Sequence, residues 1–502
     1  MDVTSMSRWT RTKIVCTLGP ATDAPGVIER LIESGMDVAR INASHGDHAD
    51  HAKRIQRVRH AAQQCDQPVA VLIDLPGPKF RLGDLPDGCC KLVEGSIVML
   101  AEEGDTADAA GDRREGSSFL PVRNPELLAA LRAQERVFLA DGSVELKVKI
   151  AASISNRVQC EVLIGGTVRS GSGINVPESA LNELVPTDDD RRHLAFAVSQ
   201  EVEWVGVSFV QSASDLARVR ALLPSGEQPL LMAKIEKRRA LANLDEIVEA
   251  ADGVMVARGD LGVETDLAEI PIVQKRIITV ANAWARPVIT ATQMLESMVE
   301  HEHPTRAEVT DVANAMLDGT DAVMLSAETA IGRFPIAAVK MLHRVLAATE
   351  AVHRISESCE PKDAGPLADK LHPYTSGFAK DALNVAACQL AVRAGARAVV
   401  VSIPSMAGAL TIARFRPDVP LVMITDSGRL YRTLSLVRGV APLFSTALDG
   451  VELQPCIAQA REWLFLQGLA QPGDQAVLLS VSGLPGNSGG EADTLQLVRM
   501  SR

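Results

Sequence analysis

Three charged side chains stand at the ends of two apolar runs in the middle of the chain. The run Leu230–Ile235 contains Lys234 and is followed directly by Glu236. The run Gly253–Ala257 ends shortly before Asp260. Short apolar runs of this kind are typical of buried parallel strands, and side chains two apart in a strand lie on the same face. We therefore expect one ammonium group and two carboxylates to converge at one edge of a sheet.

A divalent cation is the partner that this arrangement suits. Mg²⁺ is usually bound by one or two carboxylates together with oxygens of a phosphorylated substrate, so Glu236 and Asp260 are candidate metal ligands. Lys234 would supply a fixed positive charge beside the metal. The alternative is a structural ion pair that joins the two strands, although buried charges are costly unless they are paired or functional.

Composition narrows the class of protein. A chain of 502 residues predicts about three domains. Its 46% hydrophobic and 23% charged residues are typical of a soluble globular protein. The net charge of −12 disfavours nucleic acid and an anionic membrane as partners, because both need basic patches. An anionic small substrate needs only a locally positive site.

The sequence also predicts the compartment. The eight cysteines contain no Cys-x-x-Cys pair and show no regular spacing, which is typical of reduced thiols in the cytosol. The first residues contain no apolar segment of signal-peptide length. No run approaches the roughly 20 apolar residues of a membrane helix. We expect a cytoplasmic protein that does not bind a membrane.

Strands and helices alternate in two parts of the chain. Before residue 79 we expect strands Thr12–Leu18, Met36–Ile41 and Val69–Asp74 and helices Val27–Glu33 and His51–Gln64. After residue 173 we expect helix Asp188–Ser199 and strands Trp204–Phe209, Leu230–Ile235, Gly253–Ala257, Pro287–Thr290 and Ala322–Leu325. Eight strands alternating with helices predict a (β/α)₈ TIM barrel, whose active site lies at the carboxyl ends of the strands.

Two further domains are expected beside a barrel of residues 1–78 and 174–350. Residues 79–173 predict an inserted small β-barrel lid domain, with strands Ser96–Leu100, Val137–Leu139, Glu145–Ile150 and Val158–Ile164 and one helix, Glu126–Gln134. Residues 351–502 predict a C-terminal open α/β domain. It begins with the linker Glu360–Pro373 and has strands Ala398–Ser402, Leu421–Ile424, Pro442–Phe444 and Ala476–Val481.

Polar residues gather where the expected barrel strands end. They are Arg40, Asn42, Asp74, Ser208, Lys234, Glu236, Asp260, Thr290, Thr292, Ser326 and Glu328. The segment after the third strand adds Arg81, and a planar guanidinium suits a phosphate or carboxylate because it bonds two oxygens at once. Gly259 and Asp260 open an expected helix, whose free amide groups suit an anionic oxygen.

These residues lie in motifs that resemble those of the pyruvate kinase family. The motifs are TKIVCTLGPAT, ARINASHG, GPKFR, AKIE, VARGDLGVE, ATQMLESM, PTRAEVTDVANA and MLSAETA, and they span residues 12 to 332 in the family's order. The resemblance implies transfer of a phosphoryl group from phosphoenolpyruvate to ADP, followed by protonation of the pyruvate enolate. It also implies a homotetramer and the barrel, lid and C-terminal domains that the alternation predicts independently.

The resemblance assigns roles to the charged residues. Glu236 and Asp260 match the family's ligands of Mg²⁺, or Mn²⁺. Lys234 matches the lysine that neutralises charge on the transferring phosphoryl group and the developing enolate. Arg40 would hold the substrate phosphate. Such transfers depend mostly on positioning and electrostatics.

It also assigns residues to the substrate carboxylate, the proton and the nucleotide. The amides of Gly259 and Asp260, with Thr292, would bind the carboxylate. Proton delivery is attributed to the Thr292 side, with Ser326 acting through water as an alternative that stays open. The implied nucleotide-binding residues are Arg81, Asn42 and His45.

One departure from the family concerns K⁺. Members that depend on K⁺ carry glutamate where this chain has Lys79. The groups that could form a K⁺ cage are Asn42, Ser44, Asp74 and the carbonyl of Leu75. Because a lysine ammonium supplies the same unit charge and like charges repel, we expect activity without K⁺. The alternative is that Lys79 points into solvent and K⁺ is still required.

Two other departures concern the nucleotide and an effector. The family usually carries a lysine just before the segment that closes the lid domain, and here Arg169 is the nearest cation. The Thr-x-Ser-Gly-x-Thr loop that binds a sugar phosphate is replaced by Ile403–Gly408, so activation by fructose 1,6-bisphosphate is not expected. Another phosphorylated or nucleotide effector of the C-terminal domain stays open, as does the role of the loop Gly483–Gly490.

Two rival functions are weaker. A Mg²⁺-dependent carbon–carbon lyase on the same barrel also binds a pyruvate enolate with a Glu and an Asp, but it needs neither the inserted lid nor Arg81. A metabolite-binding regulator without catalysis would not need Lys234, Glu236 and Asp260 together. The sequence therefore favours a kinase.

Overall fold

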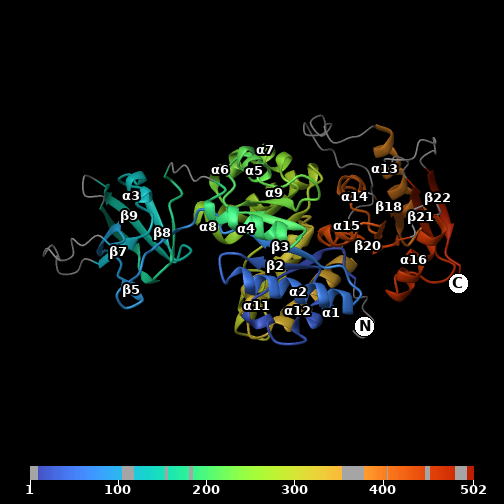
Figure 1. Ribbon diagram of the computed structural model, residues 1–502, viewed down its shortest axis with the longest axis horizontal. Coiled ribbons are helices and arrows are strands. Elements are labelled where there is room, and N and C mark those ends of the chain that lie inside the picture. The colour runs from blue at the N-terminus through green and yellow to red at the C-terminus, as the bar shows by residue number, and fades with distance from the viewer. Residues whose placement is uncertain are drawn as a thin grey trace.

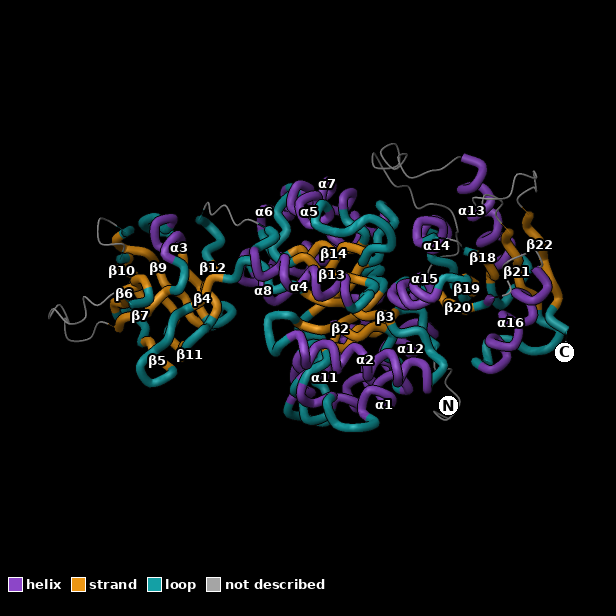
Figure 2. Tube along the Cα trace, viewed as in Figure 1, coloured by secondary structure: helices purple, strands orange, loops and turns teal. Residues whose placement is uncertain are grey.

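The computed structural model describes residues 9–104, 118–152, 157–179, 185–352, 378–403, 405–446, 453–480 and 494–501. Three bodies lie in a row in Figure 1, with the barrel between a small β-rich body and a C-terminal α/β body. Figure 2 shows their strands as separate groups. The expected fold class, a TIM barrel with an inserted lid and a C-terminal α/β domain, is confirmed. Within the described residues, no helix combines the length and apolar character that crossing a bilayer requires.

The barrel is closed and parallel throughout. Its strands, in order around the barrel, are β1 (Lys13–Thr17), β2 (Val38–Asn42), β3 (Ala70–Asp74), β13 (Trp204–Val207), β14 (Leu230–Ile235), β15 (Gly253–Ala257), β16 (Val288–Ala291) and β17 (Ala322–Leu325). β17 pairs with β1 and closes the ring. All of these strands are buried apart from half-buried ends, because helices cover the outside and side chains fill the inside.

Helices surround the strands. They are α1 (Val27–Glu33), α2 (His48–Gln64), α4 (Asp188–Ser199), α5 (Ala213–Arg220), α6 (Arg238–Ala242), α7 (Leu244–Ala250), α8 (Arg258–Glu264), α9 (Ile270–Ala283), α10 (Arg306–Leu317), α11 (Ala327–Ala330) and α12 (Pro335–Val352). The expected bounds of α1 and α4 are confirmed. α2 begins three residues earlier than expected because the Asp47 side chain accepts the amide of Asp50 at 2.8 Å and caps it.

The lid body is a seven-stranded sheet in the order β4-β12-β8-β9-β10-β6-β7. A bridge between Leu82 and Val122 joins its two edges, so that the sheet curls toward a barrel. Its elements are β4 (Phe80–Arg81), β6 (Ile97–Glu102), β7 (Ser118–Val122), α3 (Pro125–Ala130), β8 (Arg136–Leu139), β9 (Val144–Ile150), β10 (Val158–Ile164) and β12 (Gly173–Asn175). A separate pair joins β5 (Cys89–Leu92) to β11 (Gly166–Arg169).

The C-terminal body is a five-stranded sheet in the order β20-β19-β18-β21-β22. Its elements are α13 (Phe378–Arg393), β18 (Val399–Ser402), α14 (Met406–Ala413), β19 (Leu421–Thr425), α15 (Gly428–Thr433), β20 (Val440–Phe444), α16 (Leu453–Leu466), β21 (Gln475–Ser480) and β22 (Thr494–Arg499). β22 is antiparallel to β21 and was not expected from the sequence. The linker Glu360–Pro373 and the loop Gly483–Gly490 lie outside the described residues.

The C-terminal body meets the amino ends of the barrel strands. Leu436, in the short 3₁₀ helix Leu434–Leu436, is fully buried and belongs to the same apolar cluster as Trp204 and Leu72 inside the barrel. Beside it, the fully buried carboxylate of Glu203 accepts hydrogen bonds from Arg59 at 2.9 Å and from Arg432 at 2.6 Å. Arg432 lies on α15, so this cluster joins the two bodies.

Replacing Glu203 with glutamine should destabilise the protein. The amide keeps the shape but removes the charge that two guanidinium groups face, and breaking a buried ion pair costs about 3–5 kcal/mol. We expect a lower urea midpoint for Glu203→Gln, measured by tryptophan fluorescence. Glu246→Gln, at an exposed position on α7, is the matched control and should keep the parental midpoint. Equal midpoints for the two variants would contradict this assignment.

Candidate active site

Lys234 lies at the centre of a charged network at the carboxyl ends of the barrel strands. Its ammonium is 3.0 Å from Oδ1 of Asp74 and 2.8 Å from Oε1 of Glu236, and it donates to Oγ of Ser208 at 2.7 Å. Asp74 ends β3, and Ser208 and Glu236 directly follow β13 and β14; these three strands are neighbours in the sheet. The lysine side chain is only 11% exposed. The structure therefore brings Lys234 and Glu236 together as expected and adds Asp74 between Lys234 and Arg40.

Arg40 completes the network from β2. Its Nε and Nη2 donate to Oδ2 of Asp74 at 2.9 and 2.6 Å, and its Nη1 donates to Oγ1 of Thr17 at 2.9 Å. Each oxygen of Asp74 thus faces one cation. A guanidinium has five N–H groups, so others remain to bind an anion at the barrel mouth.

The charges of the network set the pKa values of its members. Burial by itself would raise the pKa of Asp74, but Lys234 and Arg40 outweigh it and hold the pKa below its usual value. Burial would lower the pKa of Lys234, but Asp74 and Glu236 raise it well above its usual value. For Glu236, burial raises the pKa, and the nearby charge of Asp260 adds to this while Lys234 opposes it. The lysine therefore stays charged over the whole physiological range.

Glu236 and Asp260 differ in their surroundings. Glu236 is 1% exposed, and its Oε2 accepts the amide of Phe209 at 2.8 Å. Asp260, in the first turn of α8, is 28% exposed, and its Oδ1 lies 3.7 Å from Nζ of Lys79. In the described part of the chain, no group of three or more His, Cys, Asp or Glu side chains could hold a metal. Two carboxylates, one fixed and one open to solvent, fit a Mg²⁺ ion that takes its other ligands from substrate and water.

The turn after β16 places Thr292 beside the start of α8. The amide of Gly259 donates to Oγ1 of Thr292 at 2.9 Å, and this hydroxyl donates to the carbonyl of Ala291 at 2.6 Å. Thr292 has φ of 70° and Gln293 has φ of 55°. A positive φ is rare for a residue other than glycine and is an outlier for a β-branched one. The structure thus joins Thr292 to Gly259 through an unusual backbone that the sequence did not reveal.

Ser326 directly follows the neighbouring strand β17. Its hydroxyl is buried and has no hydrogen-bond partner among the described residues. Its amide donates to Oε2 of Glu328 at 2.7 Å, and the amide of Leu295 donates to Oε1 of the same carboxylate at 3.0 Å. Glu328, which is fully buried, therefore fixes the loops after β16 and β17 relative to each other.

Comparison with known proteins decides the family. A pyruvate kinase barrel-domain model matches residues 9–339, and a pyruvate kinase alpha/beta-domain model matches residues 381–498. This chain belongs to the pyruvate kinase family. The pyruvate kinase of Agrobacterium vitis is 38% identical over 493 residues, covering 98% of this chain and 97% of that protein. That of Geobacillus stearothermophilus is 36% identical over 493 residues, covering 97% and 80%. That of Thermotoga maritima is 35% identical over 490 residues, covering 97% and 99%.

In this phosphotransferase, three of the four groups expected to form a K⁺ cage already have partners. Oδ1 of Asn42 accepts the amide of Ser44 at 3.1 Å, and the carbonyl of Leu75 accepts the hydroxyl of Ser208 at 2.7 Å. Both oxygens of Asp74 face the cations described above. The ammonium of Lys79 lies 3.7 Å from Asp260 and 3.4 Å from Asp141 of the lid.

The residues expected to bind the nucleotide are not all brought together. Arg81, on β4 of the lid, is half-buried and donates to the carbonyl of Gly171 at 3.1 Å. His45 is exposed in the loop between β2 and α2. Arg169, the cation nearest to the missing lysine, is exposed on β11.

Two residues that lie against loops of the site were not among the residues expected to form it. Arg258 directly follows β15 and reaches the Thr292 turn, and a charge placed directly after a buried strand could have signalled it. His51, on α2, is buried beneath the loop that carries His45, and a β-carbon on Gly46 would lie 3.3 Å from its ring. Neither ring nitrogen of His51 has a hydrogen-bond partner among the residues that the structure describes.

His51 should make stability depend on pH. Burial, helped by the charges of Arg54, His193 and His48 and opposed by Asp47, lowers its pKa from 6.5 to about 4. The unfolded chain therefore binds a proton between these pH values that the folded chain does not, so stability falls as the pH falls through this window.

The variant His51→Gln removes this titration. Because linkage acts only in this window, its urea midpoint should fall less between about pH 7 and about pH 4.5 than that of the parent. Tryptophan fluorescence at the two pH values measures both midpoints. The control, His60→Gln, changes an exposed histidine of the same helix and should follow the parent. An unchanged pH dependence in His51→Gln would show that another group is responsible.

Proposed function

We propose that this enzyme transfers a phosphoryl group from phosphoenolpyruvate to ADP, in glycolysis, with Mg²⁺ or Mn²⁺ held by Glu236 and Asp260 and without a need for K⁺. The observation that carries this proposal is the buried ammonium of Lys234 between Asp74 and Glu236, at the end of the barrel where TIM-barrel enzymes have their active sites. The metal, when bound, would neutralise phosphate charge and bridge the substrate to the protein.

Arg40 and Lys234 would bind the transferring phosphoryl group. Their contacts with Asp74 fix both cations before substrate arrives, so little reorganisation is needed as charge shifts during transfer. Because the site is largely buried, these charges act in a medium of lower dielectric constant than water, where their effect on a developing charge is larger. The amides of Gly259 and Asp260 would bind the substrate carboxylate together with Thr292, and the Gly259 amide would then exchange the Thr292 hydroxyl for a carboxylate oxygen.

Proton transfer to the enolate is proposed to occur on the Thr292 side. The Thr292 hydroxyl is held between the Gly259 amide and the Ala291 carbonyl. The buried hydroxyl of Ser326, which lacks a partner in the described part of the chain, supports a second role through water. Arg81, Asn42 and His45 are proposed to contact the nucleotide, and this requires the lid to bring β4 closer to the barrel.

Lys79 is proposed to replace K⁺. Its ammonium lies 3.7 Å from Asp260, and the Lys79 side chain is 25% exposed. A unit positive charge is therefore already present beside the proposed metal ligand. The Lys79 ammonium would repel a K⁺ ion bound close to it, and it leaves less negative charge there for K⁺ to neutralise. The alternative, that K⁺ is required despite Lys79, is an outcome of the measurement below.

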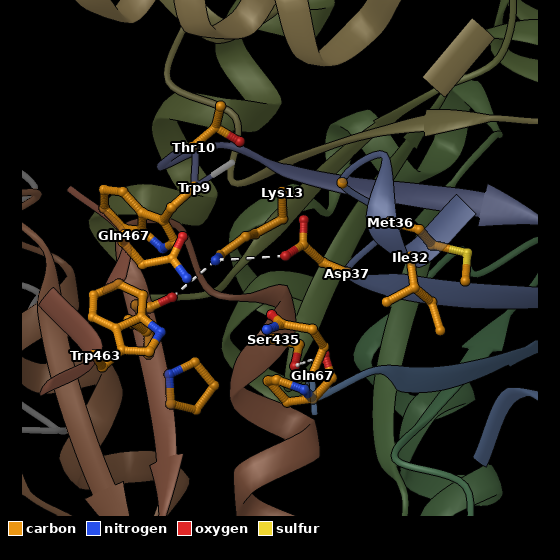
Figure 3. A pocket seen from close by; sticks show the side chains of 15 residues that line it. Trp9, Thr10, Lys13, Ile32, Met36, Asp37, Gln67, Ser435, Trp463 and Gln467 are labelled. Atoms are coloured by element: carbon orange, nitrogen blue, oxygen red, sulfur yellow. Dashed lines mark hydrogen bonds and ion pairs between the residues drawn. The ribbon is translucent and has the colours of Figure 1, made fainter. Parts of the chain in front are cut away.

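An effector of the C-terminal domain, a homotetramer and a cytoplasmic location are proposed from the family resemblance. The hydroxyl of Ser405 caps α14 by accepting the amide of Gly408 at 3.3 Å. Figure 3 shows a cavity between the amino end of β1 and the C-terminal body, where Lys13 donates to the carbonyl of Val440 at 2.8 Å. Its volume of about 60 Å³ is far below the roughly 300 Å³ of small ligand pockets, so a nucleotide would need another site.

Activity tests the proposed roles directly. The parent should release pyruvate from phosphoenolpyruvate when ADP and Mg²⁺ are both present, as measured by coupling pyruvate to a dehydrogenase. Lys234→Met keeps length but removes charge and should lower kcat by about 100- to 1,000-fold, the usual cost of losing one charge-stabilising group. Lys340→Met, at an exposed site on α12, is the control. Absence of activity in the parent, with and without KCl, would contradict the proposed function.

The monovalent cation is tested separately. In buffer free of K⁺ and Na⁺, the parent should reach its full rate, and added KCl should change it little. Lys79→Glu, which reverses the charge, should need KCl for activity. Lys91→Glu makes the same change at an exposed position of the lid and should behave as the parent. If the parent is active only with KCl, the kinase assignment stands and the role of Lys79 is wrong.

A further inference from the structure

Arg258 reaches from one catalytic loop to another. It lies where β15 ends and α8 begins, and its side chain is 10% exposed. Its Nε donates to the carbonyl of Ala291 at 3.2 Å, and its Nη2 donates to the carbonyl of Thr292 at 2.5 Å. Nη2 also lies 2.9 Å from Sδ of Met294. One guanidinium therefore contacts the last residue of β16 and two residues of the turn that follows it.

Asp311 holds the guanidinium from the other side. It lies on α10, and its two carboxylate oxygens are 2.9 and 2.8 Å from Nη1 of Arg258. Nη1 also donates to Oε1 of Gln274 at 3.4 Å, and Gln274 is itself fixed by Asp318. Hydrogen bonds between a guanidinium and a carboxylate are strong and directional. The Arg258 side chain is thus oriented by α10 through Asp311 and by α9 through Gln274.

The turn that Arg258 binds is strained. Thr292 and its neighbour Gln293 both have positive φ, of 70° and 55°. Each such residue costs about 1–3 kcal/mol and persists only where the surroundings impose it. The two carbonyls bound by Arg258 belong to the peptide groups on either side of the Thr292 backbone. Arg258 therefore fixes the two peptide planes on either side of Thr292. The relative rotation of these planes defines the backbone conformation of Thr292.

The orientation of the Thr292 hydroxyl depends on one of these planes. The hydroxyl donates to the Ala291 carbonyl, which is also the acceptor of Nε of Arg258. If this peptide group rotated, the hydroxyl would lose its acceptor and turn away from the Gly259 amide, which now donates to it. The position of the hydroxyl oxygen is therefore coupled to the guanidinium through a shared carbonyl.

We propose that Arg258, held by Asp311, is a positioning residue that keeps the hydroxyl oxygen of Thr292 in the place needed for proton transfer to the enolate. The inference rests on the proposed function of Thr292. In this step the carbon–carbon double bond of the enolate supplies the electron pair for the new C–H bond. The enolate oxygen becomes the ketone oxygen of pyruvate, and solvent restores the proton on the donor side. Arg258 acts through Thr292 and not on the substrate.

The test compares two rates in one enzyme. ATP formation from phosphoenolpyruvate and ADP reports phosphoryl transfer. Exchange of the methyl protons of pyruvate for deuterium, followed by NMR in D₂O with Mg²⁺ and ATP, reports the proton step in reverse. Arg258→Lys keeps the charge but cannot bind both carbonyls and Asp311 in one plane. We expect exchange to fall about 10- to 100-fold, the usual effect of a misplaced reacting group, with a smaller loss of ATP formation and unchanged KM values.

Two further variants keep the test decisive. Asp311→Asn weakens the hold on Arg258 and should cause a smaller loss in the same direction, which also decides the matter if Arg258→Lys does not fold. Arg276→Lys makes the same change at an exposed position of α9 and should leave both rates unchanged. Equal losses of both rates in the Arg258 and Asp311 variants, or full exchange in both, would overturn the inference. A parent that forms no ATP would instead overturn the proposed function.

Discussion

A lysine ammonium buried between two carboxylates is the interaction on which the mouth of this barrel depends. Lys234 faces Asp74 and Glu236, and Asp74 in turn faces Arg40. The four charges balance, which is why they can be buried almost completely without a prohibitive loss of solvation. The balance also has a chemical meaning. A phosphoryl group and a divalent cation bring opposite charges, so they can enter this network together without leaving either sign in excess.

The order of strands in the barrel creates this network. β2 and β3 are neighbours, and β13 separates β3 from β14. Asp74 therefore reaches Arg40 directly but meets Lys234 across the end of β13, where Ser208 fills the gap and donates to the Leu75 carbonyl. The strands that carry these side chains are far apart in sequence, and closure of the barrel brings their ends together. The outer helices and the apolar interior serve to hold the strand ends in register.

The sequence predicted the parts of the protein that follow from regular patterns. Buried strands such as Leu230–Ile235 and Gly253–Ala257 were predicted with their observed bounds, because they are continuous apolar runs. The side chains that follow them were therefore placed at the correct end of the barrel. Strand β22 was missed because it is a half-exposed edge strand without an apolar run. β4 was missed because a strand of two residues is too short to show an alternating pattern of apolar and polar side chains.

The geometry of particular side chains was beyond such patterns. No glycine marks the turn at Thr292, so its positive φ could not be read from TATQM. The contact of Arg258 with this turn joins two loops whose distance is set by the barrel as a whole. The direction of Lys79 depends on where the lid lies, since it bridges Asp141 and Asp260. These features are set by tertiary structure, and local sequence preference does not determine them.

The lid has a hydrophobic core of its own, which includes the fully buried side chains of Leu100, Leu120 and Leu146. This core is distinct from the apolar clusters of the barrel. Bodies with separate cores need not melt together, so a single melting temperature does not describe such a chain. If heating unfolds the lid before the barrel, the barrel stays folded and its charged network stays intact. The enzyme would then lose turnover before it loses its architecture, and cooling would restore it without refolding of the barrel.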